Sequence, residues 1–154
     1  MKLDIKPPKP EDFEQVAQMV YDFFREEKQK DGRTVVLNWE RIIPTVLERL
    51  RNNQEAFRYY SIFKDSKLIG MINLYFDKTK AKDLGEILLW YIKPDYRSQD
   101  GELDNYVLEW AVSTLKDLSV KKIKTEVLLT DKYALNVVQD NNFKPFTGIY
   151  MLEL

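Results

Sequence analysis

The chain has 154 residues, enough for one domain with a sizeable core, since 44% of its residues are hydrophobic and 13% are aromatic. It carries 24 basic and 25 acidic residues, a net charge of −1, which gives no basic surface for a nucleic acid. The absence of cysteine and histidine excludes disulfides, thiolate or imidazole metal sites, a cysteine nucleophile and a serine–histidine–aspartate triad. Any proton transfer must use carboxylates, tyrosines, lysines, a terminus or water.

The distribution of apolar residues predicts a cytoplasmic protein of one domain, residues 1–154. No apolar run approaches the roughly 20 residues that a membrane-spanning helix requires. Residues 1–16 carry early acidic side chains and lack the apolar segment of a signal peptide. No repeat, low-complexity tract or linker divides the sequence.

The first part of the sequence predicts one short strand followed by two helices. Residues 2–8 alternate apolar and polar side chains and stop at prolines, which is typical of a short strand. Residues 10–27 predict a helix, since a proline and two acids stand in its first turn and apolar residues recur at helical spacing. Residues 38–53 predict a second helix, which Asn38 caps and which Pro44 kinks or makes begin later.

The remaining elements predict a mixed sheet with two further helices. Asp65 and Ser66 join two strands as a hairpin, and the nearly all-apolar run that contains Trp90 and Tyr91 is typical of a strand covered on both faces. Alternation puts these two aromatic side chains on opposite faces, one at a cleft and the other in the core. The predicted order is strands 57–64, 67–77 and 84–93, a helix from Leu103 to Leu115, strand 121–130, helix 131–142 and a terminal strand 143–154.

The stretch "YIKPDYRSQDGELDNY", residues 91–106, passes from a strand through a polar loop into a helix. This layout is typical of a loop that binds an anion at a helix N-terminus, where free N–H groups and the helix dipole attract negative charge. Asp100 and Glu102, however, put two carboxylates where a phosphate would sit. A plain connecting turn remains the alternative.

The order of elements resembles that of the GNAT N-acetyltransferase family along the whole chain. The resemblance implies an α/β fold with a mixed sheet of order β-α-α-β-β-β-α-β-α-β, whose fourth and fifth strands splay apart around acetyl-coenzyme A. The loop is similar to the family's R/Q-x-x-G-x-G/A motif, and the lead-in "IKPDYR" matches as well. Arg97 fits the motif, Asp100 and Glu102 occupy its glycine positions, and Gly101 lies between them.

A second segment, "DKYALNVVQDNNF", is similar to the family's N-x-x-A…Y…G-F segment. Ala134 fits, Asp131 stands where asparagine is usual, and Asn142 replaces a glycine in a turn that asparagine also tolerates. The tyrosine that often serves the family as general acid aligns with Val138, which cannot donate a proton.

The resemblance implies a binding site for acetyl-coenzyme A as co-substrate, with no metal. The N–H groups of residues 98–103 would hold its pyrophosphate, and Arg97 would add positive charge. The residues expected to bind the coenzyme are Tyr91, Ile92, Arg97, Ser98, Gln99, Asp100, Gly101, Glu102, Leu103, Asp131 and Ala134.

The resemblance also implies catalytic roles for two residues. Glu86 stands where a subset of the family carries a general base, and an ammonium must lose a proton before it can attack a thioester. Tyr133 would replace the missing tyrosine as general acid. Their alternatives are a solvated edge glutamate and a packed or exposed tyrosine.

The predicted function is transfer of an acetyl group from acetyl-coenzyme A to a small-molecule or peptide amine. The alternatives are a GNAT-fold binding or regulatory domain without catalysis and an interaction module that uses the aromatic helices. Peptide termini, lysines, polyamines and antibiotics all remain open as acceptors, and a homodimer is compatible with the sequence. Aromatic residues of the first two helices either line the acceptor pocket or pack in the core: Tyr21, Phe23, Phe24 and Trp39.

Two structural predictions follow. Residues 86–92 and 122–129 should be neighbouring parallel strands that diverge at their carboxyl ends. The polar segments 28–36 and 78–83 should be the most mobile loops.

Overall fold

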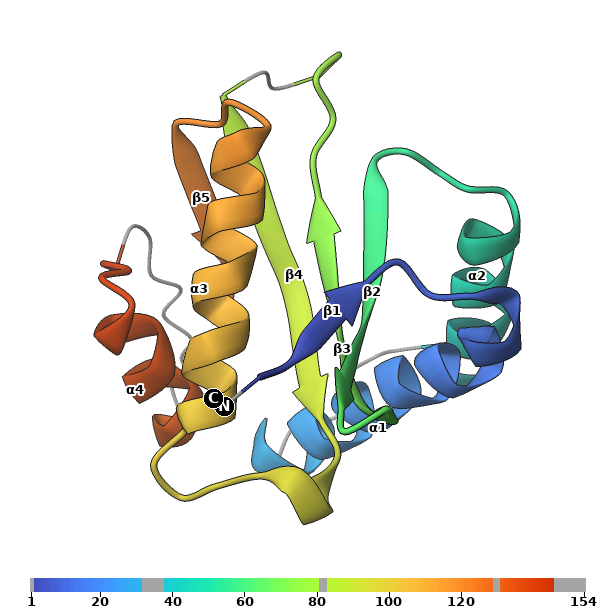
Figure 1. Cartoon of the computed structure of the whole chain (residues 1–154), viewed down its shortest axis with the longest axis horizontal. Helices are drawn as coiled ribbons and strands as arrows, with labels where there is room; N and C mark the ends of the chain where they lie inside the picture. Colours follow the sequence, from blue (N-terminus) through green and yellow to red (C-terminus); the bar gives the residue numbers. More distant parts are fainter. Residues whose placement is uncertain (1, 32–37, 81–82, 129–130, 146–154) are drawn as a thin grey trace, which may run out of the picture.

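The computed structural model describes residues 2–31, 38–80, 83–128 and 131–145, which form one mixed sheet with helices on both faces (Figure 1). The strands follow the order β1-β2-β3-β4-β5; the first four are antiparallel neighbours, and β4 and β5 are parallel. The strands are β1 (Asp4–Lys6), β2 (Phe57–Lys64), β3 (Lys67–Tyr75), β4 (Leu84–Ile92) and β5 (Lys122–Thr125). The helices are α1 (Phe13–Asp31), α2 (Trp39–Arg51), α3 (Glu102–Asp117) and α4 (Lys132–Asp140), with short 3₁₀ turns at Pro10–Asp12 and Pro94–Tyr96.

Two hydrophobic clusters fix the helices to opposite faces of the sheet. Val16, Ala17 and Val20 of α1 recur at helical spacing and pack with Val46 of α2 and the Leu89 face of β4. The second cluster joins α3 and α4 to the other face, through residues that include Val107, Leu108, Ala111, Leu115, Val137 and Val138. The sheet is therefore a central layer, and its two faces serve different helix pairs.

The first two helices form where the sequence predicts them, with two differences. The helix α1 continues to Asp31 because the polar residues after Glu27 are good helix formers. The helix α2 begins at Trp39 and runs through Pro44, so the proline does not delay its start. Asn38 stands at the N-cap position of α2 as predicted, although its side chain makes no capping hydrogen bond.

The predicted hairpin between β2 and β3 is confirmed. Asp65 and Ser66 have φ values of 50° and 63°, the left-handed conformation that a two-residue hairpin turn requires. Lys64 and Lys67 pair directly across this turn.

The predicted divergence of β4 and β5 is also confirmed. The two strands pair in parallel from Leu84 with Lys122 to Ile87 with Thr125. There the Thr125 hydroxyl donates to the Ile87 carbonyl at 3.0 Å. The strand β5 ends at this residue, earlier than predicted, whereas β4 continues along β3 as far as Ile92. The carboxyl-terminal half of β4 thus has no strand neighbour on its β5 side among the described residues.

A bulge in β4 decides which side chains face this opening. Asn73 and Leu74 of β3 pair with Leu89 and Ile87, which leaves Leu88 as an extra residue. The extra residue shifts the alternation, so that Trp90 packs with the α3 cluster and Tyr91 with the α1 cluster. The prediction that these two residues face opposite sides is confirmed.

The outer parts of the prediction can be checked only in part. The terminal strand predicted over 143–154 lies largely outside the described residues, and 143–145 form no regular element. Of the two segments predicted as mobile, 32–36 and 81–82 lie outside the description as well.

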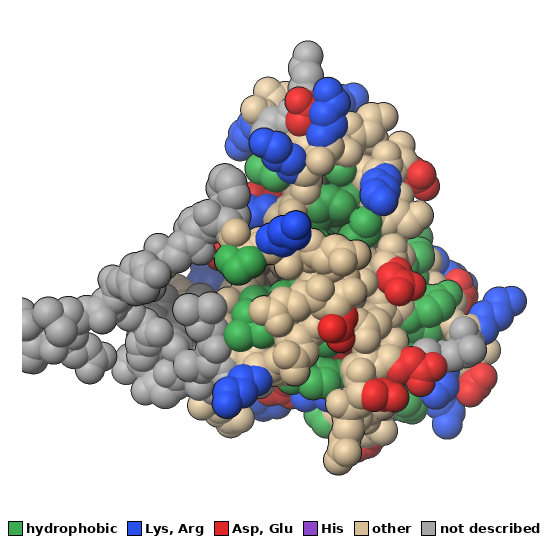
Figure 2. All heavy atoms as spheres, turned by 90° about the vertical axis from the view of Figure 1, so that its left-hand side faces the viewer, with side chains coloured by type: hydrophobic (Ala, Val, Ile, Leu, Met, Phe, Trp, Pro, Cys, Tyr) green, Lys and Arg blue, Asp and Glu red, His purple; other side chains and the backbone are tan. Residues whose placement is uncertain are grey.

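Two further observations concern surface charge and helix length in the described part of the chain. Figure 2, which views the α3 and α4 side, shows basic, acidic and scattered apolar side chains and no continuous basic patch on that face. No helix among the described residues has the length and apolar character to cross a membrane. The described residues also contain no cluster of three or more metal-ligand side chains.

Candidate functional site

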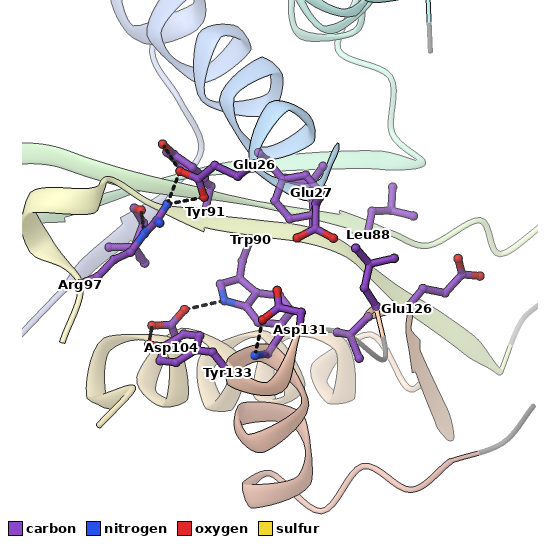
Figure 3. A pocket seen from close by; sticks show the side chains of 16 residues that line it. Glu26, Glu27, Leu88, Trp90, Tyr91, Arg97, Asp104, Glu126, Asp131 and Tyr133 are labelled. Carbon is purple, nitrogen blue, oxygen red and sulfur yellow. Dashed lines mark hydrogen bonds and ion pairs between the residues drawn. The ribbon is translucent and has the colours of Figure 1, made fainter. Parts of the chain in front are cut away.

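A cleft lies beside the carboxyl-terminal half of β4, where β5 has ended (Figure 3). Residues 88–92 form its floor. One wall is the end of α1, and the opposite wall is the start of α4 with the segment that follows β5. Segments far apart in the sequence therefore meet at the divergence of the two strands.

The loop between β4 and α3 ends at Gly101, the residue before the first turn of α3. Gly101 has a φ of 69°, in the left-handed region that favours glycine. A Cβ atom there would lie 3.3 Å from both the Tyr133 hydroxyl and a Val137 methyl group. The backbone angle and the close approach of α4 both favour a glycine here, although it stands one position away from those of the family motif.

The carboxylate of Asp100 lies at the helix N-terminus. Its Oδ1 accepts the Glu102 N–H at 3.2 Å. The Ser98 hydroxyl and this N–H hold the pKa of Asp100 below its ordinary value. The side chain thus occupies a donor that a phosphate would use, while Glu102 is exposed.

The Arg97 side chain points toward α1 (Figure 3). One guanidinium nitrogen, Nη2, lies 3.0 and 2.9 Å from the two carboxylate oxygens of Glu26. Its Nε donates to the Ile92 carbonyl at 2.7 Å, and the guanidinium lies 5.0 Å from the Tyr91 ring centroid. The role of Arg97 toward a phosphate stays a prediction, and its charge is already paired in this arrangement.

Asp104 joins three elements beneath the cleft. It is 5% exposed and accepts hydrogen bonds from Trp90 Nε1 at 2.8 Å and from the Tyr133 hydroxyl at 2.6 Å. Burial, followed by the hydrogen bond to Asp104, raises the pKa of Tyr133. The Tyr133 proton is therefore directed at a carboxylate inside the protein, which makes it a poor donor to a leaving group.

The start of α4 forms the wall next to Tyr133. Asp131 is buried, and its side chain accepts the Ala134 N–H at 3.1 Å, which makes it the N-cap of α4. Both residues line the cleft. Val138 is 6% exposed and belongs to the core, so the position where the family often carries its tyrosine is closed to chemistry.

The structure brings most of the predicted coenzyme residues together. Five of them line the cleft, as does the predicted catalytic residue Tyr133; the five are Tyr91, Ile92, Arg97, Asp131 and Ala134. The loop residues 98–102 adjoin it through Gly101, which approaches Tyr133. Leu103 is buried in the core cluster, so only its backbone faces the loop.

Glu86 is the predicted residue that the structure places apart from the cleft. It lies on β4 before the bulge, half-buried, opposite Tyr75 on one side and Lys124 on the other. The Glu126 carboxylate, followed by the charge of Glu86, raises the pKa of Lys124. The general-base role of Glu86 stays a prediction.

Sequence reasoning missed four other carboxylates that line the cleft, Glu26, Glu27, Asp104 and Glu126. Figure 3 shows Glu27 pointing into the cavity from α1. Glu26 and Glu27 end an amphipathic helix segment, a common place for solvated charges, so no local signal marks them. Asp104 gave no signal either, because an acidic residue in the first turn of a helix is already explained by its favourable interaction with the helix dipole.

The predicted aromatic residues of α1 and α2 divide between cleft and packing. Phe23 lines the cleft and meets Phe24 edge to face at 5.3 Å. Tyr21 and Trp39 form a second edge-to-face pair, 5.4 Å apart, that joins the two helices.

Comparison with known proteins gives consistent findings. The sequence model of the Acetyltransferase (GNAT) family matches residues 13–143. Acetyltransferase PseH of Campylobacter jejuni is 29% identical over 86 residues, 56% of this chain and 50% of PseH, so the match spans half of that protein's length.

Two solved structures share the fold. The PaiA N-acetyltransferase of Thermoplasma acidophilum, solved in complex with coenzyme A, has a TM-score of 0.68 and 21% identity over 94% of this chain and 91% of its own. A predicted acetyltransferase of Clostridium acetobutylicum, solved with acetyl-CoA, has a TM-score of 0.68 and 15% identity over 99% of this chain and 96% of its own. With a family match across most of its length and the divergent strands that hold its cleft, the chain belongs to the GNAT acetyltransferase family.

Proposed function

We propose that the protein transfers an acetyl group from acetyl-coenzyme A to an amine. The observation that carries this proposal is the cleft where β4 continues beyond the last β4–β5 pair, Ile87 with Thr125. Two fold neighbours were solved with coenzyme A or acetyl-CoA, which supports the same ligand here.

The bulge at Leu88 would orient the thioester. Leu88 has no partner residue on β3, and β5 has ended beside it, so the backbone of the cleft floor can approach the acetyl carbonyl. Backbone N–H groups that point at a carbonyl stabilise the negative charge that develops on its oxygen during attack. The pyrophosphate would bind at residues 98–103, next to the start of α4.

The reaction requires one proton acceptor and one proton donor. The acceptor ammonium gives up one proton to a carboxylate, and its nitrogen then bonds to the acetyl carbon. The bond from carbon to sulfur breaks, and the nitrogen releases a second proton as the amide forms. The thiolate then takes a proton from a group or from water. Glu86 is the base that the resemblance implies, and Glu27 is one of the carboxylates that line the cleft.

A binding or regulatory domain without catalysis is the second candidate. Asp100 occupies a helix N–H, Arg97 is paired with Glu26, and Val138 is buried where a tyrosine is usual. The first two features weaken phosphate binding at residues 97–103, and the third removes the usual general acid. None of them closes the cleft.

The test combines binding with transfer. Acetyl-CoA at millimolar concentration should raise the melting temperature, because a ligand at ten times its Kd stabilises the fold by about 1.4 kcal/mol. Incubation with a panel of amines should release free thiol and add an acetyl group to one amine class, which mass spectrometry detects.

Gly101→Val supplies the matched control, because its side chain would strain the backbone and meet Tyr133. This variant, checked for folding by circular dichroism, should lose both effects. Binding without transfer to any amine favours the second candidate, and absence of binding by the native chain overturns the proposed ligand.

A further inference from the structure

The Glu26 carboxylate receives two donors, one from the end of β4 and one from the residue after the following 3₁₀ turn. Arg97 Nη2 contacts both of its oxygens, and the Tyr91 hydroxyl lies 3.4 Å from Oε1. The Arg97 guanidinium is itself oriented by the Ile92 carbonyl and by the Tyr91 ring. We call this set of contacts, made by Glu26, Tyr91, Ile92 and Arg97, the α1 latch.

The latch is shielded enough to restrain position. The side chains of Arg97 and Glu26 are 34% and 25% exposed, so water and salt screen the pair less than a fully exposed one. An arginine held at both Nε and Nη2 also has less freedom to rotate away than one held at a single nitrogen.

The latch holds the part of α1 that needs a restraint. The buried residues of α1, Val16, Ala17, Met19 and Val20, anchor its first half to the sheet. The last turns, which carry Phe23, Glu26 and Glu27 into the cleft wall, are only half-buried. Phe23 and Phe24 pack against the core cluster there, and the latch adds a polar restraint at Glu26, beyond these aromatic contacts.

We propose that Glu26 is a positioning residue for the acyl acceptor. It acts through Arg97 and Tyr91, holds the last turns of α1 against the end of β4, and so sets the cleft wall opposite α4. This role rests on the proposed acetyl transfer. In this proposal Arg97 holds α1 in place, and the backbone N–H groups of residues 98–103 bind the coenzyme phosphates.

The test compares Glu26→Gln with Arg25→Gln. The control breaks a 3.0 Å ion pair between Arg25 and Asp22 on the same helix, outside the latch. For Glu26→Gln we expect the KM for the acceptor amine to rise about tenfold, as for loss of a charged hydrogen bond. The Kd for acetyl-CoA should stay within about twofold of the native value, and Arg25→Gln should change neither quantity.

Amide hydrogen exchange gives a second readout that needs no activity. Exchange in residues 24–29 should be faster in Glu26→Gln than in the native chain and in Arg25→Gln, because the end of α1 opens more often. Arg97→Lys keeps the charge but cannot make both contacts, so it should change exchange and KM in the same direction.

Three results would overturn the role. Native exchange in Glu26→Gln would mean that the latch does not hold α1. A weaker or tighter Kd for acetyl-CoA with an unchanged acceptor KM would show that the pair serves the phosphates. If the native protein acetylates no amine, the proposed function is refuted, and so is the role of Glu26 in acceptor positioning. The hydrogen-exchange result would still show whether the latch holds the end of α1.

Discussion

At the scale of single residues, the carboxylate of Asp100 does for the α3 N-terminus what a bound phosphate does in a coenzyme loop. It accepts a backbone N–H and is held ionised by that bond and by the Ser98 hydroxyl. A pyrophosphate therefore meets an engaged donor and a like charge at once.

We expect replacement of Asp100 to strengthen coenzyme binding. Asp100→Asn removes the charge, and Asp100→Gly also frees the N–H and the backbone, so affinity should improve about threefold for Asn and about tenfold for Gly. The gain should shrink as salt rises from about 0.02 to 0.5 M. Isothermal titration with acetyl-CoA measures both effects. The control is Asp95→Asn, which removes an exposed acid in the preceding turn. If Asp100→Gly binds acetyl-CoA as tightly as the native chain does, the Asp100 carboxylate does not compete with the coenzyme phosphates.

Glu86 and Glu27 make opposite predictions about the general base. If Glu86 takes the proton, Glu86→Gln should lower kcat by about 10² to 10⁴-fold with little change in coenzyme affinity, and Glu27→Gln should retain kcat. If the cleft carboxylate is the base, the two variants exchange these outcomes. We expect the loss in Glu27→Gln, since Glu27 lines the cleft and Glu86 does not. Retained kcat in both variants would assign the proton to water.

Local chemistry explains which site residues the sequence could predict. The loop around Gly101 and the cap at Asp131 depend on neighbours within a few residues, so their roles can be anticipated from the chain itself. The partner of Arg97 is 71 residues away on another helix, and no local pattern marks that pairing. Long-range pairs of charged groups therefore account for what the sequence missed.

At the scale of the elements, the spacing of apolar residues and the turn residues predict that the described helices and strands exist. They predict the ends of these elements less well. The run "ILLW" in β4 is apolar throughout, so alternation could not reveal the bulge at Leu88. The strand β5 was predicted too long because the apolar residues after Thr125 line the cleft instead of continuing the ladder.

The proline in α2 gives a stability test at this scale. Pro44 lies inside the helix and is exposed, where it removes one helical hydrogen bond. Pro44→Ala should raise the free energy of unfolding by about 1 to 3 kcal/mol, measured by urea denaturation. Pro10→Ala is the matched control, since Pro10 stands at a 3₁₀ helix start that favours proline; it should be neutral or slightly destabilising. If the free energy of unfolding of Pro44→Ala equals that of the native chain, the helix already adjusts around the proline.

At the scale of the whole molecule, the contact of Tyr133 with Asp104 connects α4, α3 and, through Trp90, the floor of the cleft. The buried carboxylate of Asp104 therefore connects three elements that are not adjacent in the sequence as one continuous segment. The cleft could be predicted as a gap between two strands, but not the network beneath it.

This network should give the fold a pH dependence above neutrality. Burial and the bond to Asp104 raise the pKa of Tyr133, so the folded chain keeps a proton that the unfolded chain releases near pH 10. The stabilisation is complete below about pH 10 and is lost as the pH rises through the folded pKa. Tyr133→Phe should cost about 1 kcal/mol at pH 7 and lose less stability than the native chain from about pH 9 to 11.

Urea denaturation at these pH values measures the difference. Tyr96→Phe, a change at a half-buried tyrosine outside this contact, is the control, because the lysines, which also titrate in this pH range, are the same in both variants. Parallel pH profiles for the native chain and Tyr133→Phe would show that the hydroxyl adds nothing to stability.

The strand β1 has a consequence for how copies of the protein meet in concentrated solution. Among the described residues it is the outer strand on its side of the sheet, and it is only three residues long. It carries Lys6 and is followed at once by Pro7 and Pro8. Short outer strands with a lysine and prolines offer few free backbone groups to an approaching strand. The border of the sheet at β1 therefore resists edge-to-edge aggregation, and a second copy would have to dock elsewhere.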